Sequence, residues 1–220
     1  MSKRWMVAGL LAGLTFSAFA DSKGKAGQPS DPWQGMNRKV FAFNDAMDRW
    51  VLKPVAKGYA KITPRLVRRG VSNFFGNLSY PLVIVNDFLQ GKFADGASDT
   101  GRFVMNTTLG LGGLFDPAAG AGLKQHDEDF GQTFAKWGAG SGPFLVLPFL
   151  GPSDVRDGLG SAVGIYAQPI RYLIDDERTR YGLAALNFIE IRASLLDAEQ
   201  LISGDRYAFM RDAYLQRREY

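Results

Sequence analysis

The segment from Gly138 to Pro152 is strongly apolar and carries no charged residue, yet glycine and proline interrupt it repeatedly. A helix that crosses a bilayer needs ~20 apolar residues, so this segment is too short and too broken to be one. Pro148 would also remove a ladder hydrogen bond from any central strand. The segment is therefore predicted to be an irregular apolar connector, which either is buried in an ordinary core or shapes a hydrophobic wall at an interface.

Most of the remaining chain has helical spacing. Apolar residues recur at steps of three and four from Met36 to Trp50 and again from Val67 to Leu78. Pro54 should end or kink the first of these helices, and Thr63-Pro64 should cap and begin the second. Further helices are predicted at 82–90 (after Tyr80-Pro81, with Gly91 as its C-cap), 127–137, 153–166 (capped by Ser153), 176–202 and 205–218.

Period-two alternation and internal repeats are both absent from the sequence, so the predicted fold class is all-α. The N-terminus has the form of a secretory signal peptide, because Lys3 and Arg4 precede an apolar stretch and Ala18-Phe19-Ala20 offers a small-x-small cleavage site. We expect a signal peptide at 1–20, a polar tether at 21–31 and a single helical domain at 32–220.

Charge and cysteine usage exclude several classes of protein. Removal of residues 1–20 would reduce the net charge from +4 to +2, which argues against nucleic-acid binding by an exported chain. The sequence contains no cysteine, so a disulfide, a thiolate metal site, a cysteine nucleophile and a lipid-modified cysteine are all excluded within it.

The sequence proposes no catalytic, cofactor or metal site. His126 is the only histidine, and its acidic neighbours are typical of a helix start, although an acid–base or metal cluster is the alternative interpretation. Ser141 is one position out of register with a Gly-x-Ser-x-Gly elbow, and no phosphate loop or dinucleotide fingerprint is present.

A basic stretch is more informative. No acidic residue occurs between Arg49 and Asn86, and several cations there are spaced by four residues. Beside apolar stripes, such cations would suit a surface that faces anionic head groups, at roughly 1 kcal/mol each, while a solvated face is the alternative. The candidate head-group residues are Lys53, Lys57, Lys61, Arg65, Arg68 and Arg69.

Asparagines accompany the aromatic residues in several of the predicted helices. A buried amide without a partner costs ~1–3 kcal/mol, so these side chains should either join helices together or line a wet passage. A second glycine-rich apolar segment covers 109–122.

Many short motifs occur in one order along nearly the whole chain from Asp31 to Tyr214. They include Asp31-Pro32-Trp33, Asn37-Arg38, Phe43-Asn44, Lys53-Pro54-Val55-Ala56, Asn73-Phe74-Phe75, Arg102-Phe103 with Asn106, Asp129-Phe130-Gly131-Gln132-Thr133, Gly142-Pro143-Phe144, Leu147-Pro148 and Gly151-Pro152-Ser153. In these motifs the sequence resembles the MlaA/VacJ family of outer-membrane lipid-asymmetry proteins.

The resemblance implies an α-helical ring or disc embedded at the inner leaflet of the outer membrane. Such a protein would remove misplaced phospholipid from the outer leaflet through a central amphipathic channel and pass it to a periplasmic lipid-carrier protein. Association with a trimeric porin is also implied, and no bond is broken, so the protein would not be an enzyme. The family's members typically carry a lipidated cysteine at the cleavage site, which this sequence replaces with Ala20-Asp21.

The two glycine-rich segments are the candidates for the mouth or wall of the lipid path, because glycine lets a backbone curve and approach closely. With the neighbouring amides, the candidate lipid-path residues are Phe43, Asn44, Asn73, Phe74, Asn106, Leu109, Gly112, Leu114, Gly142, Phe144 and Leu147. The alternatives are a porin-docking structural protein without transport and a periplasmic lipid hydrolase that uses Ser141 or His126.

Exported protein should be cleaved after Ala20 and should carry no acyl group, because the cleavage site is followed by aspartate and the chain has no cysteine. The intact mass of protein recovered from the envelope checks this expectation. A mass that retains residues 1–20, or one that includes an acyl chain, would contradict it.

Overall fold

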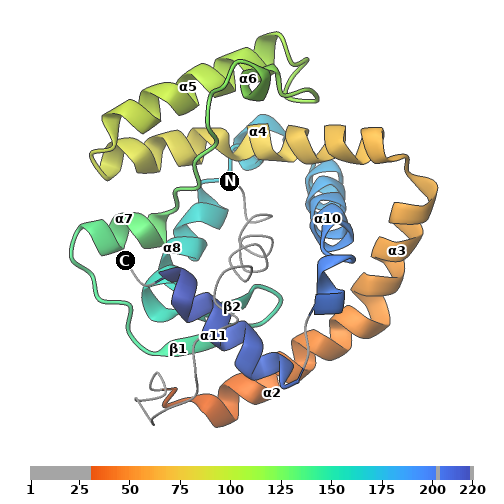
Figure 1. The fold of residues 1–220 in the computed structure, drawn as a ribbon, viewed down its shortest axis with the longest axis vertical. Helices are drawn as coiled ribbons and strands as arrows, with labels where there is room; N and C mark the ends of the chain where they lie inside the picture. Colours follow the sequence, from red (N-terminus) through yellow and green to blue (C-terminus); the bar gives the residue numbers. More distant parts are fainter. Residues whose placement is uncertain (1–30, 202–203, 219–220) are drawn as a thin grey trace.

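A computed structural model describes residues 31–201 and 204–218 of the chain. Helices succeed one another around a ring-like outline (Figure 1). One side of the ring is formed by α2 (Gln34–Met47), the π-helical turn η2 (Asp48–Leu52) and α3 (Lys53–Ile62), and α4 (Arg65–Leu89) forms the next. The predicted signal peptide and all of the predicted tether except Asp31 lie outside the described residues, so the domain boundary stays a prediction.

The second half of the chain completes the ring and covers one of its faces. The ring's opposite side holds α7 (Phe130–Lys136) and α8 (Val155–Tyr166), while α10 (Glu177–Ser194) lies along α3. Helix α5 (Phe93–Thr108) and the short α6 (Pro117–Gly120) lie outside the ring, beyond α4. The remaining helical elements are α9 (Ile170–Leu173), η3 (Ala198–Leu201) and α11 (Arg206–Arg218).

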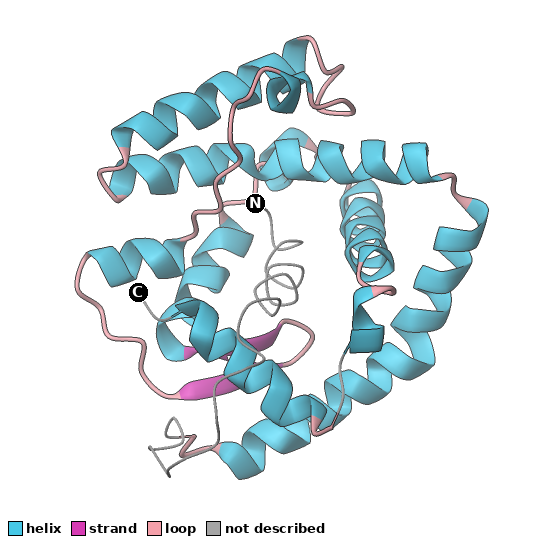
Figure 2. Cartoon of the chain, in the orientation of Figure 1, coloured by secondary structure: helices cyan, strands magenta, loops and turns pink. Residues whose placement is uncertain are grey.

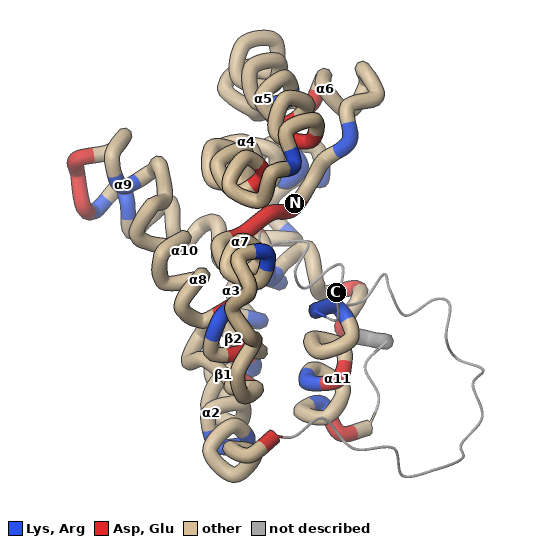
Figure 3. Tube along the Cα trace, turned by 90° about the vertical axis from the view of Figure 1, so that its left-hand side faces the viewer, with Lys and Arg blue, Asp and Glu red and all other residues tan. Residues whose placement is uncertain are grey.

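The ring has two distinct faces. Figure 3 shows α9 projecting on one side of the molecule and α11 lying on the other. In Figure 1, α11 crosses in front of the ring, from the end of α2 toward α7 and α8. The all-α prediction is confirmed, with the addition of one small sheet (Figure 2).

That sheet was missed by the sequence prediction of an irregular connector. Strands β1 (Phe144–Leu147) and β2 (Gly151–Asp154) pair as an antiparallel hairpin, with Phe144 opposite Asp154 and Leu147 opposite Gly151. Pro148 lies in the turn, where no ladder bond is lost, and Pro152 lies in a two-stranded sheet that has no central strand. Four-residue strands are too short to give a recognisable alternation.

Of two prolines expected to affect helices, Pro81 departs from the prediction and Pro54 agrees with it. Pro81 does not start a new helix, because α4 continues through it as a single 25-residue element. Pro54 follows η2, where the Lys53 N–H donates to the Asp48 carbonyl, five residues back. A wider π turn moves the carbonyl that would clash with the proline ring, so the chain bends there without leaving the helix.

Helix starts differ from the predictions by one to three residues, because aspartates provide the caps. Asp129 caps α7, Asp154 caps α8 and Asp176 caps α10, each accepting a hydrogen bond from the N–H three residues on. Ser153 therefore does not cap α8, and Thr63 does not cap α4, whose N-cap position is occupied by Pro64. The predicted helix at 176–202 is divided into α10 and η3.

The α7–α8 contact depends on glycine. A Cβ atom on Gly160 would overlap the backbone of Gly131, and one on Gly131 would overlap the Asp157 carboxylate. Only hydrogen fits at this crossing, so the two helices approach backbone to backbone.

The hairpin is attached to α2 by a fully buried amide. Asn37 donates to the Phe144 carbonyl at 3.1 Å and to Asp31 at 2.8 Å, and its oxygen accepts from the Val146 N–H at 2.9 Å. The same strand packs on α11, since Phe144 and Val146 form a core cluster with Tyr207 and Tyr214. One asparagine thus fixes the position of β1 relative to α2.

Replacement of Asn37 by alanine should lower the free energy of unfolding by about 2–3 kcal/mol, because it leaves a buried strand N–H and a carbonyl without partners. Asn73→Ala is the matched control, since that amide makes one exposed bond and should cost less than about 1 kcal/mol. Denaturant unfolding of both variants decides the matter, and equal losses would contradict the assignment.

Candidate functional site

Compared with an ordinary water-soluble domain, this fold buries many polar side chains and exposes many large apolar ones. The largest fully buried side chains among the described residues are all polar: Asn37, Asn86, Thr133, Asp87 and Asp99. Large apolar side chains are instead exposed on α2, α3, α4, α5, α8, α9 and α10, including Ile62 at 80% and Leu66 at 72%. An apolar surface this extensive is not expected of a monomer in water and indicates contact with lipid or protein.

The asparagines of the sequence motifs join elements together. Asn86 accepts from Thr133 at 2.7 Å, which links α4 to α7, and Asn77 donates to Thr107 at 2.9 Å, which links α4 to α5. Asn106 donates to Asp116 and accepts from the Ala118 N–H. Of the two roles that the sequence left open, the structure assigns these amides to joining helices.

Asn44 holds the turn of the hairpin. Its amide donates to the Leu147 carbonyl at 2.9 Å and accepts from the Phe149 N–H at 2.9 Å. The Phe43 ring meets the Phe149 ring edge-on at 5.5 Å. Figure 2 shows that the turn between the two strands points toward the middle of the ring.

This hairpin turn, residues 148–150, presents apolar groups without burying them. Phe149 and Leu150 are both exposed, and Phe149 has a φ of 61°, a conformation that is strained for a phenylalanine. A strained backbone persists only where surrounding contacts hold it in place, and such residues are commonest at functional sites. Phe149 was not among the residues singled out from the sequence, since a positive φ leaves no sequence signal at a non-glycine residue.

The predicted lipid-path residues fall into two groups. Phe43, Asn44, Gly142, Phe144 and Leu147 surround the hairpin, with Phe144 buried in the core cluster. The second group lies where α4 and α5 meet the loop that follows α5: Asn73, Phe74, Asn106, Leu109, Gly112 and Leu114. In both Figure 1 and Figure 3, α2 and α5 lie at opposite ends of the long axis, so the structure does not bring the two groups together.

The predicted head-group cations are divided in a similar way. Lys53 is paired with Glu199 at 2.9 Å, at the edge of a cleft of about 390 Å³ that Lys57, Leu196 and Asp197 also line. Lys57, Lys61, Arg65 and Arg69 are exposed. Arg68 is partly buried, and its Nε has no hydrogen-bond partner among the described residues.

Helix α11 is fastened to both sides of the ring by ion pairs. At its start, Arg206 contacts Asp45 at 2.6 Å and Glu199 at 3.4 Å, and Arg38 pairs with Asp205 at 2.8 Å. Glu199 also accepts hydrogen bonds from Lys53 and Arg192. Burial would raise the pKa of Glu199, but these hydrogen bonds outweigh it and lower the pKa to about 2.

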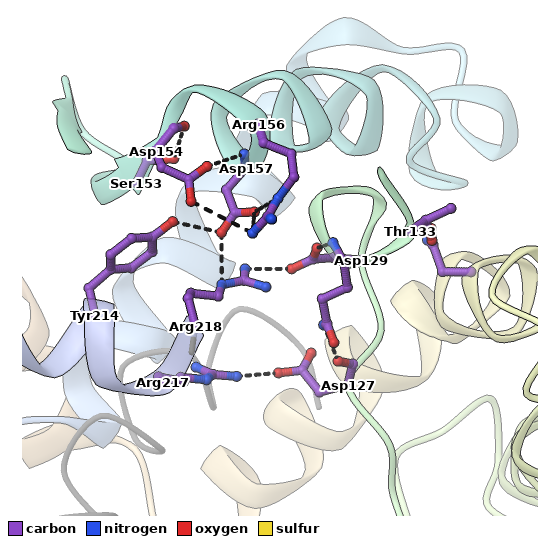
Figure 4. Close-up of polar contacts among 12 residues, drawn as sticks. Asp127, Asp129, Thr133, Ser153, Asp154, Arg156, Asp157, Tyr214, Arg217 and Arg218 are labelled. Atoms are coloured by element: carbon purple, nitrogen blue, oxygen red, sulfur yellow. Dashed lines mark hydrogen bonds and ion pairs between the residues drawn. The ribbon is translucent and has the colours of Figure 1, made fainter. Parts of the chain in front are cut away.

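The far end of α11 forms the cluster in Figure 4. Arg218 bridges Asp157 of α8 and Asp129 at the start of α7, both at 2.8 Å. The Tyr214 hydroxyl donates to Asp157 at 2.6 Å, and Arg217 reaches Asp127 at 2.7 Å. Burial nevertheless raises the pKa of Asp127 to about 6. We call α11 with these end contacts the strap.

A pair of buried acids lies between α4 and α5. Asp87 and Asp99 are both fully buried, and neither oxygen of Asp87 has a hydrogen-bond partner in the part of the chain that the structure describes. His126 contacts Asp99 at 3.0 Å, and Lys92 pairs with Glu128 nearby at 2.7 Å. Burial, and then the charge of Asp99, raise the pKa of Asp87 to about 7.

The described residues contain no cluster of three or more histidine or acidic side chains arranged to hold a metal ion. Within 31–201 and 204–218, no helix combines the length and the hydropathy that bilayer crossing requires.

Comparison with known proteins gives consistent matches. The family model described as MlaA lipoprotein matches residues 29–220. The "Intermembrane phospholipid transport system lipoprotein MlaA" of Escherichia coli is 38% identical over 217 residues, covering 96% of this chain and 84% of the relative. The protein of the same name from Haemophilus influenzae is 26% identical and covers 100% of this chain and 91% of the relative.

A solved structure supports the same grouping. It was reported in work on the structural basis for maintenance of bacterial outer membrane lipid asymmetry, and it superposes with a TM-score of 0.74 at 38% identity. The match covers 86% of this chain and 96% of that one. A Rickettsia typhi protein of uncharacterized function is also 38% identical, over 86% of this chain and 76% of its own length.

Stability should fall as pH rises from about 4 to about 7 and then level off, because the folded state keeps a proton on Asp87 that the unfolded chain releases near its ordinary value. Asp87→Asn should flatten this dependence and raise the melting temperature at pH 8 by a few degrees, at about 2–4 °C per kcal/mol. Glu128, His126 and Asp99 face the same carboxyl. Burial also raises the pKa of Asp127, to about 6, so Asp127 contributes a smaller slope that Asp87→Asn leaves in place.

Melting curves between pH 4 and 8 test this expectation, with Asp175→Asn as the control at an exposed site. A steep slope that survives in Asp87→Asn would show that another group is responsible.

Proposed function

The chain belongs to the MlaA lipoprotein family, and on that basis we propose that it transports phospholipid to maintain outer-membrane lipid asymmetry. It removes misplaced phospholipid from the outer leaflet through a central amphipathic channel. The lipid then passes to a periplasmic lipid-carrier protein. The protein acts at the periplasmic face of the outer membrane, embedded in the inner leaflet.

One observation carries this proposal: a strained apolar turn directed toward the middle of a ring whose own joints are polar. Phe149 and Leu150 offer acyl chains a dry contact, while the amide of Asn44 fixes the backbone of the turn beneath them. The N–H of Phe149 is bonded to Asn44 and that of Leu150 to the Pro148 carbonyl, so acyl chains would not leave a backbone N–H of the turn unpaired.

The hairpin group is therefore the proposed lipid path. Phe43, Asn44 and Leu147 form its wall together with the turn, and Phe144 anchors that wall in the core. Gly142 provides the bend before β1 with a φ of 69°, and a Cβ there would press on Val155 at 3.0 Å. The Lys53–Lys57 cleft is the proposed contact for phosphate groups, since Lys57 is exposed at its edge.

Partners follow from the same proposal. A trimeric porin covers part of the apolar outer surface, and the periplasmic lipid carrier receives the lipid. The exposed apolar side chains of α3, α8 and α10 are available for these lipid and protein contacts.

Catalysis is not part of the proposed function. His126 is engaged with Asp99 and Asp95 on the α5 side of the molecule. Ser141 precedes β1, and its carbonyl accepts a hydrogen bond from the Arg156 N–H at the start of α8. The two residues of the hydrolase alternative thus belong to different parts of the fold.

Phe149→Asn should impair lipid passage without loss of folded protein. Asparagine tolerates positive φ and keeps the backbone bond to Asn44, so the substitution removes only the apolar side chain. Substitutions at Gly112 or Gly142 would not separate lipid passage from stability, because both glycines have positive φ and any side chain strains the backbone there.

Outer-membrane permeability, protein abundance and melting temperature should be measured together in cells that carry the variant as their only copy. Tyr172→Asn is the matched control, because Tyr172 on α9 is as exposed as Phe149 and lies outside the hairpin. An intact barrier with abundant, folded Phe149→Asn protein would refute the lipid path proposed here. A defect that only follows lost protein would refute it equally.

A further inference from the structure

The glycine-rich segment 109–115, here called the outer loop, follows α5 on the outer side of α4, away from the middle of the ring (Figure 2). Its apolar side chains are largely exposed, with Leu109 at 71%, Leu111 at 64% and Phe115 at 55%. Because the hairpin points inward and the outer loop lies at the edge, the two glycine-rich segments have different surroundings.

Five of the seven backbone N–H groups of the outer loop have hydrogen-bond partners close by in the chain. These donors reach carbonyls in the last turn of α5 or within the loop itself, and the Asn73 amide donates to the Leu114 carbonyl. An unpaired backbone polar group is costly in hydrocarbon, so these internal bonds lower the cost of bringing the loop into contact with acyl chains. The donors with such partners are the N–H groups of Leu109, Gly110, Gly112, Gly113 and Phe115.

A fixed conformation directs the apolar side chains outward. Leu111, Gly112 and Gly113 have φ angles of 52°, 70° and 91°, three left-handed residues in succession. Gly113 lies against Asn77 so closely that a Cβ atom would overlap it. A leucine in this conformation costs roughly 1–2 kcal/mol, so its place at an exposed tip is not explained by packing.

The base of the loop is an ion pair between a buried arginine and a half-buried aspartate. Arg102 binds Asp116 through both carboxylate oxygens, at 2.9 and 2.7 Å, and donates to Tyr80 at 2.8 Å. Between these two charges, residues 103–115 carry none. The loop is therefore a rigid, uncharged projection on a charged base.

Two exposed cations belong to the same helix, α4, that supports this projection. Gly70, Asn73 and Asn77 share one face of α4 and carry the loop, since Gly70 approaches the Leu114 carbonyl and Asn77 approaches Gly113. One turn earlier on α4, Arg65 and Arg69 are exposed, in a stretch without any acidic residue. Apolar groups beside cations match one chemistry in particular, that of acyl chains joined to anionic phosphates.

We propose that the outer loop inserts among the acyl chains of the bilayer and that Arg65 and Arg69 bind the phosphates of the same lipids. The outer loop is then a membrane anchor rather than a wall of the lipid path. This inference rests on the proposed membrane location but not on lipid passage. In it, Leu109, Gly112 and Leu114 hold the protein in the membrane, and the hairpin contacts the transported lipid.

The absence of cysteine allows a direct test. Full-length protein carrying Phe115→Cys is labelled with an environment-sensitive fluorophore and added to vesicles of phosphatidylethanolamine and phosphatidylglycerol. Emission should shift to the blue, and quenchers attached to acyl chains should be more effective than aqueous iodide. The control is Gln216→Cys, an exposed polar position on α11, which should show neither effect.

The cations are tested by Arg65→Gln with Arg69→Gln. At about 1 kcal/mol for each cation near an anionic surface, this double variant should bind anionic vesicles about 30-fold more weakly and phosphatidylcholine vesicles unchanged. Lys39→Gln with Lys136→Gln is the matched control, because it removes the same charge from exposed sites elsewhere.

A third variant separates the anchor from transport. Leu111→Asn keeps the positive φ, so it should fold normally and yet weaken insertion, whereas Phe149→Asn should leave insertion intact. A vesicle-bound protein whose Phe115 probe stays accessible to iodide would overturn the proposal. So would shielding of the probe by a protein partner in the absence of lipid, or an equal loss of binding in the two charge-changed double variants.

Discussion

A chain whose large apolar side chains face outward has to be held together by polar groups inside, and this requirement shapes the whole structure. Asn37 joins α2 to the hairpin, Asn86 joins α4 to α7, and Arg102 holds the base of the outer loop. Each bond is directional and lies in surroundings with little water, so each is stronger than it would be on a surface. Glycine contacts between α7 and α8 serve the same purpose without side chains.

The same constraint explains why the two glycine-rich segments can present apolar groups. A loop that relies on burial for its stability cannot expose leucine and phenylalanine. Here the hairpin turn is held by Asn44, and the outer loop is held by Asn73 and by its own backbone bonds. The apolar side chains are left unused by the fold, and they remain available for lipid on the inside and outside of the ring.

The sequence predicted helices well where apolar stripes were long, as in α2 and α4, because a stripe of that kind can only be satisfied by a helix. The break expected at Pro54 is present as a π turn, whereas the prediction failed at Pro81, which α4 continues through, and at the short hairpin. The candidate residues were found as motifs, but their division between ring and edge depends on long-range contacts. Phe149 and Asp87 could not be recognised, since strain and complete burial are properties of the folded state.

The strap gives this architecture an order in time. Helix α11 follows the other described elements in the chain, and it carries the guanidinium groups that bridge Asp45 and Glu199 near one side of the ring to Asp129 and Asp157 on the other. Before residues 206–218 dock, Asp129 and Asp157 lack the guanidinium group of Arg218, while Asp45 and Glu199 keep basic partners from the rest of the ring. Docking of the strap therefore has to follow formation of the elements that it joins, and a chain whose strap is undocked exposes carboxylates of α7 and α8 that the folded structure neutralises.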